Sequence, residues 1–186
     1  MYAGRGCFSP PCPVFGGTYT GYEEADAKAV VGVKQIVPLR DRIAVLAENS
    51  WAAIQGRNAL KVTWDEGSNA TIDSQEMMAA AAGRIKPVTR SNMLSATYES
   101  PYEAHATMEP MNCTAHMHDG VCELWAPTQS PQEVRRAVAR AVEMSEDQVI
   151  VHVPLIGGGF GRRLEADYAV EAALVALAVD APVQVL

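Results

Sequence analysis

Alternating apolar and polar positions divide the first third of the chain into short elements. Apolar residues predict strands at residues 33–39 and 42–47, with a turn at Arg40-Asp41 between them. The remaining predictions are an extended stretch, two helices and a strand: residues 12–20, 22–30, Ser50 (as the cap) to about Leu60, and 61–64. The order β-α-β-β-α-β is typical of a split βαβ sandwich.

In the second half of the chain, the spacing of the apolar residues changes from a strand pattern to a helical pattern. Four short stretches predict strands, at residues 94–98, 104–108, 114–117 and 121–125, and His118-Asp119-Gly120 predicts a hairpin turn between the last two. Ser130 and Pro131 then suit the N-cap and first position of a helix, whose apolar residues recur at helical spacing. The later predictions are a strand, a glycine loop, an apolar helix and a final strand: residues 148–153, 157–163, 167–179 and 182–186.

These patterns predict an α+β fold in two parts. Residues 1–73 form a small α/β module, and residues 96–186 open a mixed-sheet domain that is incomplete. Residues 74–95 are expected to link them through a short helix that Asp73 and Glu76 cap, followed by a polar, exposed stretch over residues 87–92. Because the strand from Pro182 needs further pairing, we expect a partner chain or a longer sequence to complete the sheet.

Composition excludes several classes of protein. The 186 residues carry a formal charge of −7, and this acidic balance argues against a nucleic-acid binder or an anionic-membrane binder. No run approaches the roughly 20 consecutive apolar residues of a membrane span. No signal peptide is visible, so the expected location is cytoplasmic by default, with a periplasmic complete enzyme left open.

Cysteine and histidine spacing is a weak signal for metal. Cys7, Cys12, Cys113 and Cys122 form no CxxC pair, so buried or free thiols are expected. His116 and His118 would point to one face of a strand, as a metal site requires. The favoured interpretation is a polar strand face that leads into the hairpin turn.

The strongest chemical signal is the glycine run Gly157-Gly158-Gly159-Phe160-Gly161-Arg162-Arg163. Such a run lets the backbone adopt positive φ and bring its amides close to an anion, with two guanidinium groups beside it. It lacks the Lys-Ser/Thr of a P-loop and the sixth glycine of GxGxxG, so a simple nucleotide-binding enzyme is disfavoured. The alternative is a tight turn between strand and helix with two solvated arginines.

Three motifs in order carry a resemblance to a known family. Met108-Glu109-Pro110-Met111-Asn112-Cys113, Trp125-Ala126-Pro127-Thr128-Gln129-Ser130 and the glycine run resemble the molybdopterin-binding large subunit of molybdenum hydroxylases, the xanthine dehydrogenase and aldehyde oxidase family. Their variants are most similar to the isoquinoline 1-oxidoreductase and bacterial aldehyde dehydrogenase branch. Trp51-Ala52-Ala53-Ile54-Gln55-Gly56-Arg57 resembles that branch's hammerhead domain.

The resemblance implies a cofactor-binding set: Gln129, Gly158, Gly159, Phe160, Gly161 and Arg162. Gln129 matches a glutamine that hydrogen-bonds an oxygen ligand of molybdenum, and Phe160 lies in the loop whose amides approach the oxo group. Glycines at 158, 159 and 161 would admit the cofactor closely. His105 and Glu109 match a family His and Glu, for which a structural hydrogen bond is as good an interpretation as a site contact.

The resemblance also implies an activity and its partners. The complete enzyme would hydroxylate N-heteroaromatic rings or aldehydes with water as oxygen donor, using molybdenum-molybdopterin in the cytosine dinucleotide form. Electrons would pass to iron–sulfur clusters on a small partner subunit, and the catalytic glutamate would come from the remainder of the large subunit. This chain alone is then expected to bind no cofactor and to be inactive. The alternative is a non-catalytic module for anion binding or subunit assembly.

Overall fold

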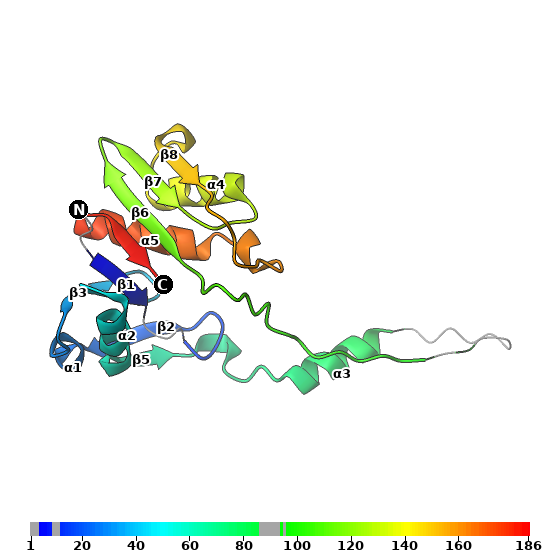
Figure 1. The fold of residues 1–186 in the computed structure, drawn as a ribbon. Helices are drawn as coiled ribbons and strands as arrows, with labels where there is room; N and C mark the ends of the chain where they lie inside the picture. Colours follow the sequence, from blue (N-terminus) through cyan, green and yellow to red (C-terminus); the bar gives the residue numbers. More distant parts are fainter. Residues whose placement is uncertain (1–3, 9–11, 86–93, 95) are drawn as a thin grey trace.

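A mixed seven-stranded sheet forms the centre of the computed structural model, which describes residues 4–8, 12–85, 94 and 96–186 (Figure 1). Its strand order is β3-β4-β1-β9-β6-β7-β8, and β2 and β5 form a separate two-stranded sheet. The strands are β1 (Gly4–Phe8), β2 (Thr18–Glu23), β3 (Val33–Pro38), β4 (Ile43–Ala47), β5 (Lys61–Asp65), β6 (Cys113–His118), β7 (Val121–Trp125), β8 (Val149–His152) and β9 (Val183–Val185). The α-helices are α1 (Ala25–Lys28), α2 (Ser50–Ala59), α3 (Ser74–Arg84), α4 (Pro131–Ala141) and α5 (Asp167–Val179).

The helices cover the sheet from two sides. Every residue of β4 is buried. Ala44 and Leu46 pack into the core that α5 completes, whereas Val45 packs into the core beside β2, and Ala47 contacts the α2 side. Since adjacent strand residues point to opposite faces, α2 and α5 lie on opposite faces of the sheet. A strand that is covered on both faces typically consists of consecutive apolar residues, and Ile43–Ala47 has this pattern.

The two predicted parts share one sheet. The final strand β9 pairs in parallel with β1 and antiparallel with β6, so both of its neighbours lie in this chain. The expectation that the strand from Pro182 needs a partner chain or a longer sequence for its pairing is therefore wrong. Strand β1, which was not predicted from the sequence, supplies the missing neighbour. Arg42 also pairs with Glu171 of α5, which adds a polar contact between the two parts.

Most of the other predicted helices, strands and turns are confirmed, with local corrections. The β6–β7 hairpin turns at Asp119 and Gly120, both at positive φ, and α5 has the predicted bounds. The predicted split βαβ sandwich is wrong, because its strands do not form one sheet. Strands β2 and β5 pair with each other, whereas β3 and β4 belong to the seven-stranded sheet. The helix predicted over residues 22–30 is shorter in the structure and comprises only α1, because β2 continues to Glu23.

Two predicted caps also differ in detail. The side chain of Asn49, one residue before Ser50, accepts from the Ala52 amide and caps α2. The Ser130 side chain makes no cap hydrogen bond to α4, and its own amide instead donates to Thr128 Oγ1. Helix α3 is capped by Asp73 as predicted.

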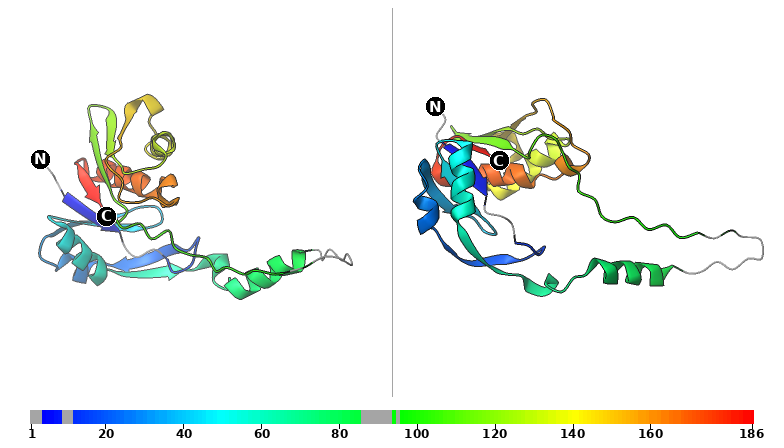
Figure 2. Two further views of the ribbon diagram at one scale, coloured as in Figure 1. Left: turned by 45° about the vertical axis from the view of Figure 1, so that its right-hand side comes forward. Right: turned by 60° about the horizontal axis from the view of Figure 1, so that its bottom comes forward.

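A long arm leaves the body of the protein between β5 and β6 (Figure 2). All residues of α3 are exposed, and the segment that returns over residues 96–112 contains no strand. The predicted strands at 94–98 and 104–108 are therefore wrong in their described residues: this part of the backbone runs without a neighbouring strand, and a strand requires one. The predicted polar stretch over residues 87–92 lies outside the described residues.

The described thiols behave as small buried or surface groups. Cys12, Cys113 and Cys122 are free, and burial raises the pKa of Cys122 to about 11 and that of Cys113 further above its usual range. Thiols held in the protonated form make poor metal ligands. None of the helices in the described ranges is long and apolar enough to cross a membrane.

Replacement of Gly56 by alanine should destabilise the fold. A Cβ at this position in α2 would lie 2.6 Å from Val33 Cγ2 and 2.8 Å from Val45 Cγ1, which are buried or half-buried atoms of the sheet. We expect Gly56→Ala to lower the free energy of unfolding by about 1–3 kcal/mol in urea titrations. The matched control is Gly83→Ala in the exposed helix α3, where a Cβ meets open space and stability should stay equal or rise. Equal effects of the two changes would contradict the packing of α2 on the sheet.

Candidate functional site

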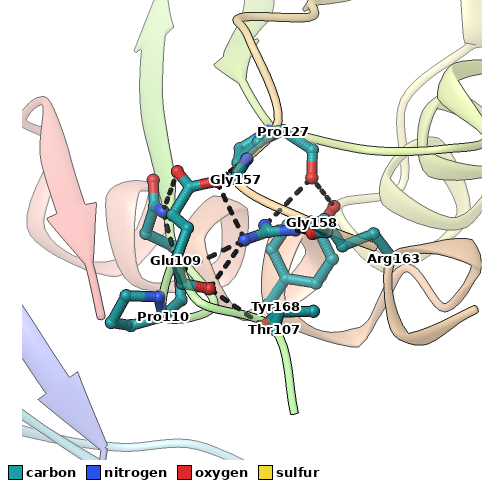
Figure 3. Close-up of polar contacts among 9 residues, drawn as sticks. Thr107, Glu109, Pro110, Pro127, Gly157, Gly158, Arg163 and Tyr168 are labelled. Carbon is teal, nitrogen blue, oxygen red and sulfur yellow. Dashed lines mark hydrogen bonds and ion pairs between the residues drawn. The ribbon is translucent and has the colours of Figure 1, made fainter. Parts of the chain in front are cut away.

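A buried arginine joins the three motifs that the sequence analysis placed together. The Arg163 side chain is fully buried, and each of its three nitrogens has a hydrogen-bond acceptor. Nε donates to Gly158 O at 2.8 Å, Nη1 to Pro127 O at 3.1 Å, and Nη2 to Glu109 O at 2.9 Å (Figure 3). One guanidinium therefore ties the glycine loop to two segments that are distant in sequence. The alternative of two solvated arginines is wrong for Arg163.

The carboxylate of Glu109 completes this buried junction. Its Oε2 accepts from Arg163 Nη2 at 3.0 Å and from the Gly157 amide at 2.8 Å, while Oε1 accepts from Asn112 Nδ2 at 2.9 Å. Burial by itself raises the pKa of Glu109, but the two amide hydrogen bonds and the charge of Arg163 outweigh it and hold the pKa below its ordinary value of 4.5. Glu109 is thus an ionised structural partner of the loop.

Backbone and hydroxyl groups fix the segment before α4 to the same junction. The carbonyl of Arg163 accepts from Thr128 Oγ1 at 3.0 Å and from the Gln129 amide at 3.0 Å. The buried Tyr168 hydroxyl of α5 donates to Pro127 O at 3.0 Å. Within the described residues no buried side-chain nitrogen or oxygen lacks a hydrogen-bond partner. The segment that carries Gln129 is therefore held against the loop on several sides.

The outer side of the glycine loop is open. Gly158 and Gly161 have φ of +97° and +93°, and Phe160 has φ of 49° and a side chain that is 69% exposed. The Gly157 and Gly161 amides are bound to side chains, whereas the amides of Gly158, Gly159 and Phe160 donate to no described residue. Consecutive amides at such a turn form a concave donor site for an anionic or oxo ligand.

Gln129 lies directly against this loop. Its Oε1 accepts from the Gly161 amide at 3.1 Å. A Cβ added at Gly159 would lie 2.4 Å from Gln129 Oε1, so only glycine allows the carboxamide to occupy this place. The structure thus brings together Gln129 and the loop residues 158–161 of the predicted cofactor-binding set.

Arg162 and His105 lie at the edge of the loop. Arg162 forms a bidentate pair with Asp167 at the start of α5, at 2.8 and 2.7 Å. The ring of His105 lies 3.6 Å from where a Gly161 Cβ would be. The places of Arg163, Asn112, Thr128 and Tyr168 in this network were not predicted, because residue type and order do not reveal which side chains meet in the folded chain.

The glycine loop and its supporting network lie in a fold of mixed helices and strands, and comparison with known proteins identifies its family. The molybdopterin cofactor-binding domain family matches residues 65–186, and the chain belongs to this family.

Two curated relatives match most of the chain. It is 28% identical over 191 residues to a protein named membrane-bound aldehyde dehydrogenase [pyrroloquinoline-quinone] from Gluconacetobacter polyoxogenes, covering 89% of this chain and 24% of that protein. It is 28% identical over 199 residues to isoquinoline 1-oxidoreductase subunit beta from Brevundimonas diminuta, covering 94% of this chain and 26% of the relative. The chain therefore spans about a quarter of the length of these relatives.

Solved structures of molybdenum hydroxylases share the fold. Quinoline 2-oxidoreductase from Pseudomonas putida 86 aligns over 100% of this chain and 31% of its own, with a TM-score of 0.68 and 18% identity. At this identity the likeness concerns the fold, and it confirms the mixed α+β class expected from the sequence.

Removal of the buried guanidinium should cost far more stability than removal of its neighbour. Arg163→Met removes the ion-pair partner of Glu109 and one donor from each of three carbonyl groups, so we expect a loss of about 3–5 kcal/mol in the free energy of unfolding. Arg162→Met removes a partly exposed pair and should cost less than about 1 kcal/mol. Urea titration of both variants tests this contrast, and a small cost for Arg163→Met would show that the junction does not hold the loop.

The contribution of Glu109 should depend on pH. Its folded pKa lies below its unfolded value, so its stabilisation is complete above about pH 5 and is lost as pH falls through the folded pKa. Glu109→Gln should therefore lower stability by about 1–3 kcal/mol at pH 7 and by less near pH 3, as measured by urea unfolding at both pH values. Glu133→Gln, on the exposed face of α4, is the control with little effect at either pH. A cost of Glu109→Gln that is the same at both pH values would refute the role of its charge.

Proposed function

We propose that this chain is part of the molybdopterin-binding subunit of an oxidoreductase that hydroxylates N-heteroaromatic rings or aldehydes, with water as the oxygen donor. One observation carries the proposal: the open amides of Gly158, Gly159 and Phe160 lie on a loop that also binds the Gln129 carboxamide. Family membership supports the cofactor, and the names of the relatives support the two substrate classes.

The residues at the loop suit the proposed cofactor. The absence of a Cβ at Gly159 leaves room for the Gln129 carboxamide beside the loop, and the amides of Gly158, Gly159 and Phe160 are donors without added charge. Gln129 Oε1 is held by Gly161, whereas Gln129 Nε2 donates to no residue in the described ranges and can donate to an oxygen ligand. When bound, the cofactor supplies two-electron redox chemistry at molybdenum. Gln129 and residues 158–161 would orient it, with Arg162 at the edge of the site.

The catalytic base is proposed to come from outside this chain. The carboxylates of Glu109 and Asp167, which bond to residues of the loop, each pair with an arginine. For Glu109 the lowered pKa makes the carboxylate a weaker proton acceptor, because a general base works best with a pKa near the operating pH. These carboxylates therefore support and position the loop.

The finer assignments extend the same proposal. The cofactor would be the cytosine dinucleotide form, and electrons would leave to iron–sulfur clusters on a small partner subunit. Support comes from the resemblance to the isoquinoline branch and from a relative whose name describes one subunit of several. The remainder of the large subunit would supply the rest of the cofactor site.

The test is a glycine substitution in the full-length protein that carries this segment. Gly159→Ala places a Cβ against Gln129 and should displace the carboxamide from the loop, so molybdenum and pterin content per protein should fall well below that of the unsubstituted protein. Metal analysis and pterin fluorescence measure the content, and oxidation of a quinoline-type ring and an aldehyde measures activity. Gly83→Ala in α3 is the control that should keep both.

The opposite outcome would favour a different class of function. A full-length protein that contains no molybdenum and oxidises neither substrate, even without substitution, would indicate a non-catalytic module for anion binding or subunit assembly. Full cofactor content in Gly159→Ala would show that the loop does not receive the cofactor.

A further inference from the structure

A polar cluster lies on the sheet face opposite the α4–α5 core, away from the glycine loop residues. On β6, Ala115 and Cys113 point into that core, so His116 and His118 share the other face. Helix α2 packs on this face over the part of the sheet formed by β1, β3 and β4. His116, His118 and Glu123 are each partly exposed, and their histidine nitrogens and carboxylate oxygens offer one ligand atom each, all within 4.8 Å of one another.

We propose that His116, His118 and Glu123 form a binding site for a divalent transition-metal ion such as Zn²⁺, with water at the fourth position. Imidazole and carboxylate are ligands that Zn²⁺ takes in three-residue sites with an open position. Tetrahedral bonds of about 2.0–2.2 Å set ligand atoms about 3.4 Å apart, so a small rotation of partly exposed side chains closes the site. The site is separate from the proposed function and does not depend on it.

The sheet register positions the three ligands before any metal arrives. His116 lies directly opposite Glu123 in the antiparallel β6–β7 pair, and the His116 and His118 rings lie 4.6 Å apart between centroids. His118 Nε2 is 3.1 Å from Glu123 Oε2. Because two strands of a hydrogen-bonded sheet supply all three side chains, metal binding requires no rearrangement of the backbone.

His152 supports the carboxylate from the next strand. Its Nε2 lies 2.8 Å from Glu123 Oε1, the oxygen that does not face His118. Its ring stacks on Trp125 with centroids 5.2 Å apart and an interplanar angle of 20°. A histidine bonded to the free oxygen of a ligating carboxylate orients it for the metal. His152 is thus a positioning residue, and this arrangement distinguishes the cluster from a chance pair of surface histidines.

The test titrates the metal-free, full 186-residue chain with Co²⁺, whose visible absorption reports its ligands. We expect one equivalent to bind with the strong bands of four-coordinate Co²⁺ and to be displaced by Zn²⁺. His116→Ala, His118→Ala and Glu123→Gln should each weaken binding more than about 100-fold, and His152→Gln about 10–100-fold. His105→Ala, which removes the histidine outside the cluster, is the matched control and should bind as the unsubstituted chain does.

Circular dichroism and urea midpoints should be the same in all these variants, because the substituted side chains are partly or fully exposed. Absence of saturable binding would overturn the proposal. So would unchanged affinity in the His116→Ala/His118→Ala double variant, or a thiolate-to-cobalt charge-transfer band, which would assign the metal to cysteine.

Discussion

The buried guanidinium of Arg163 is the interaction on which the rest of the candidate site depends. A charge in this position is tolerated only when it is fully paired, and here Glu109 and backbone carbonyls of three separate segments satisfy it. Each segment in turn gains a partner that it could not find locally. This one side chain contacts the glycine loop, the segment before β6 and the segment before α4 at the same time.

This arrangement leaves the loop bound on its inner side and open on its outer side. The Gly157 and Gly161 amides are used to attach the loop to Glu109 and Gln129, while the amides between them remain available. The glycine at 159 follows from sterics, because any side chain would displace Gln129. A rigid base with open donors is the form that a preorganised ligand site takes, since the donors need no rearrangement on binding.

Local pattern was sufficient for elements whose signal lies within the element itself. Helix α5 and the strands β4 and β7 follow from apolar runs or alternation, and the β6–β7 turn follows from Asp119 and Gly120, which accept positive φ. Pairing partners could not be predicted in the same way. Strand β1 pairs with β9 in the large sheet, whereas β2 pairs with β5 in a separate sheet. Such pairing depends on which distant segments of the chain meet.

The sequence by itself determined the class of fold and the motifs of the candidate site, because residue type and order carry that information. Gln129 and the loop residues 158–161 were identifiable from the chain, and the structure places Gln129 against the loop. Only the tertiary structure decided that Arg163 is buried while Arg162 pairs with Asp167 near the surface, since two adjacent arginines have the same local pattern. The same holds for His152, which reaches Glu123 only because β7 and β8 are neighbours in the sheet. Burial and partner choice are properties of the packed chain, and packing is set by contacts between residues far apart in sequence.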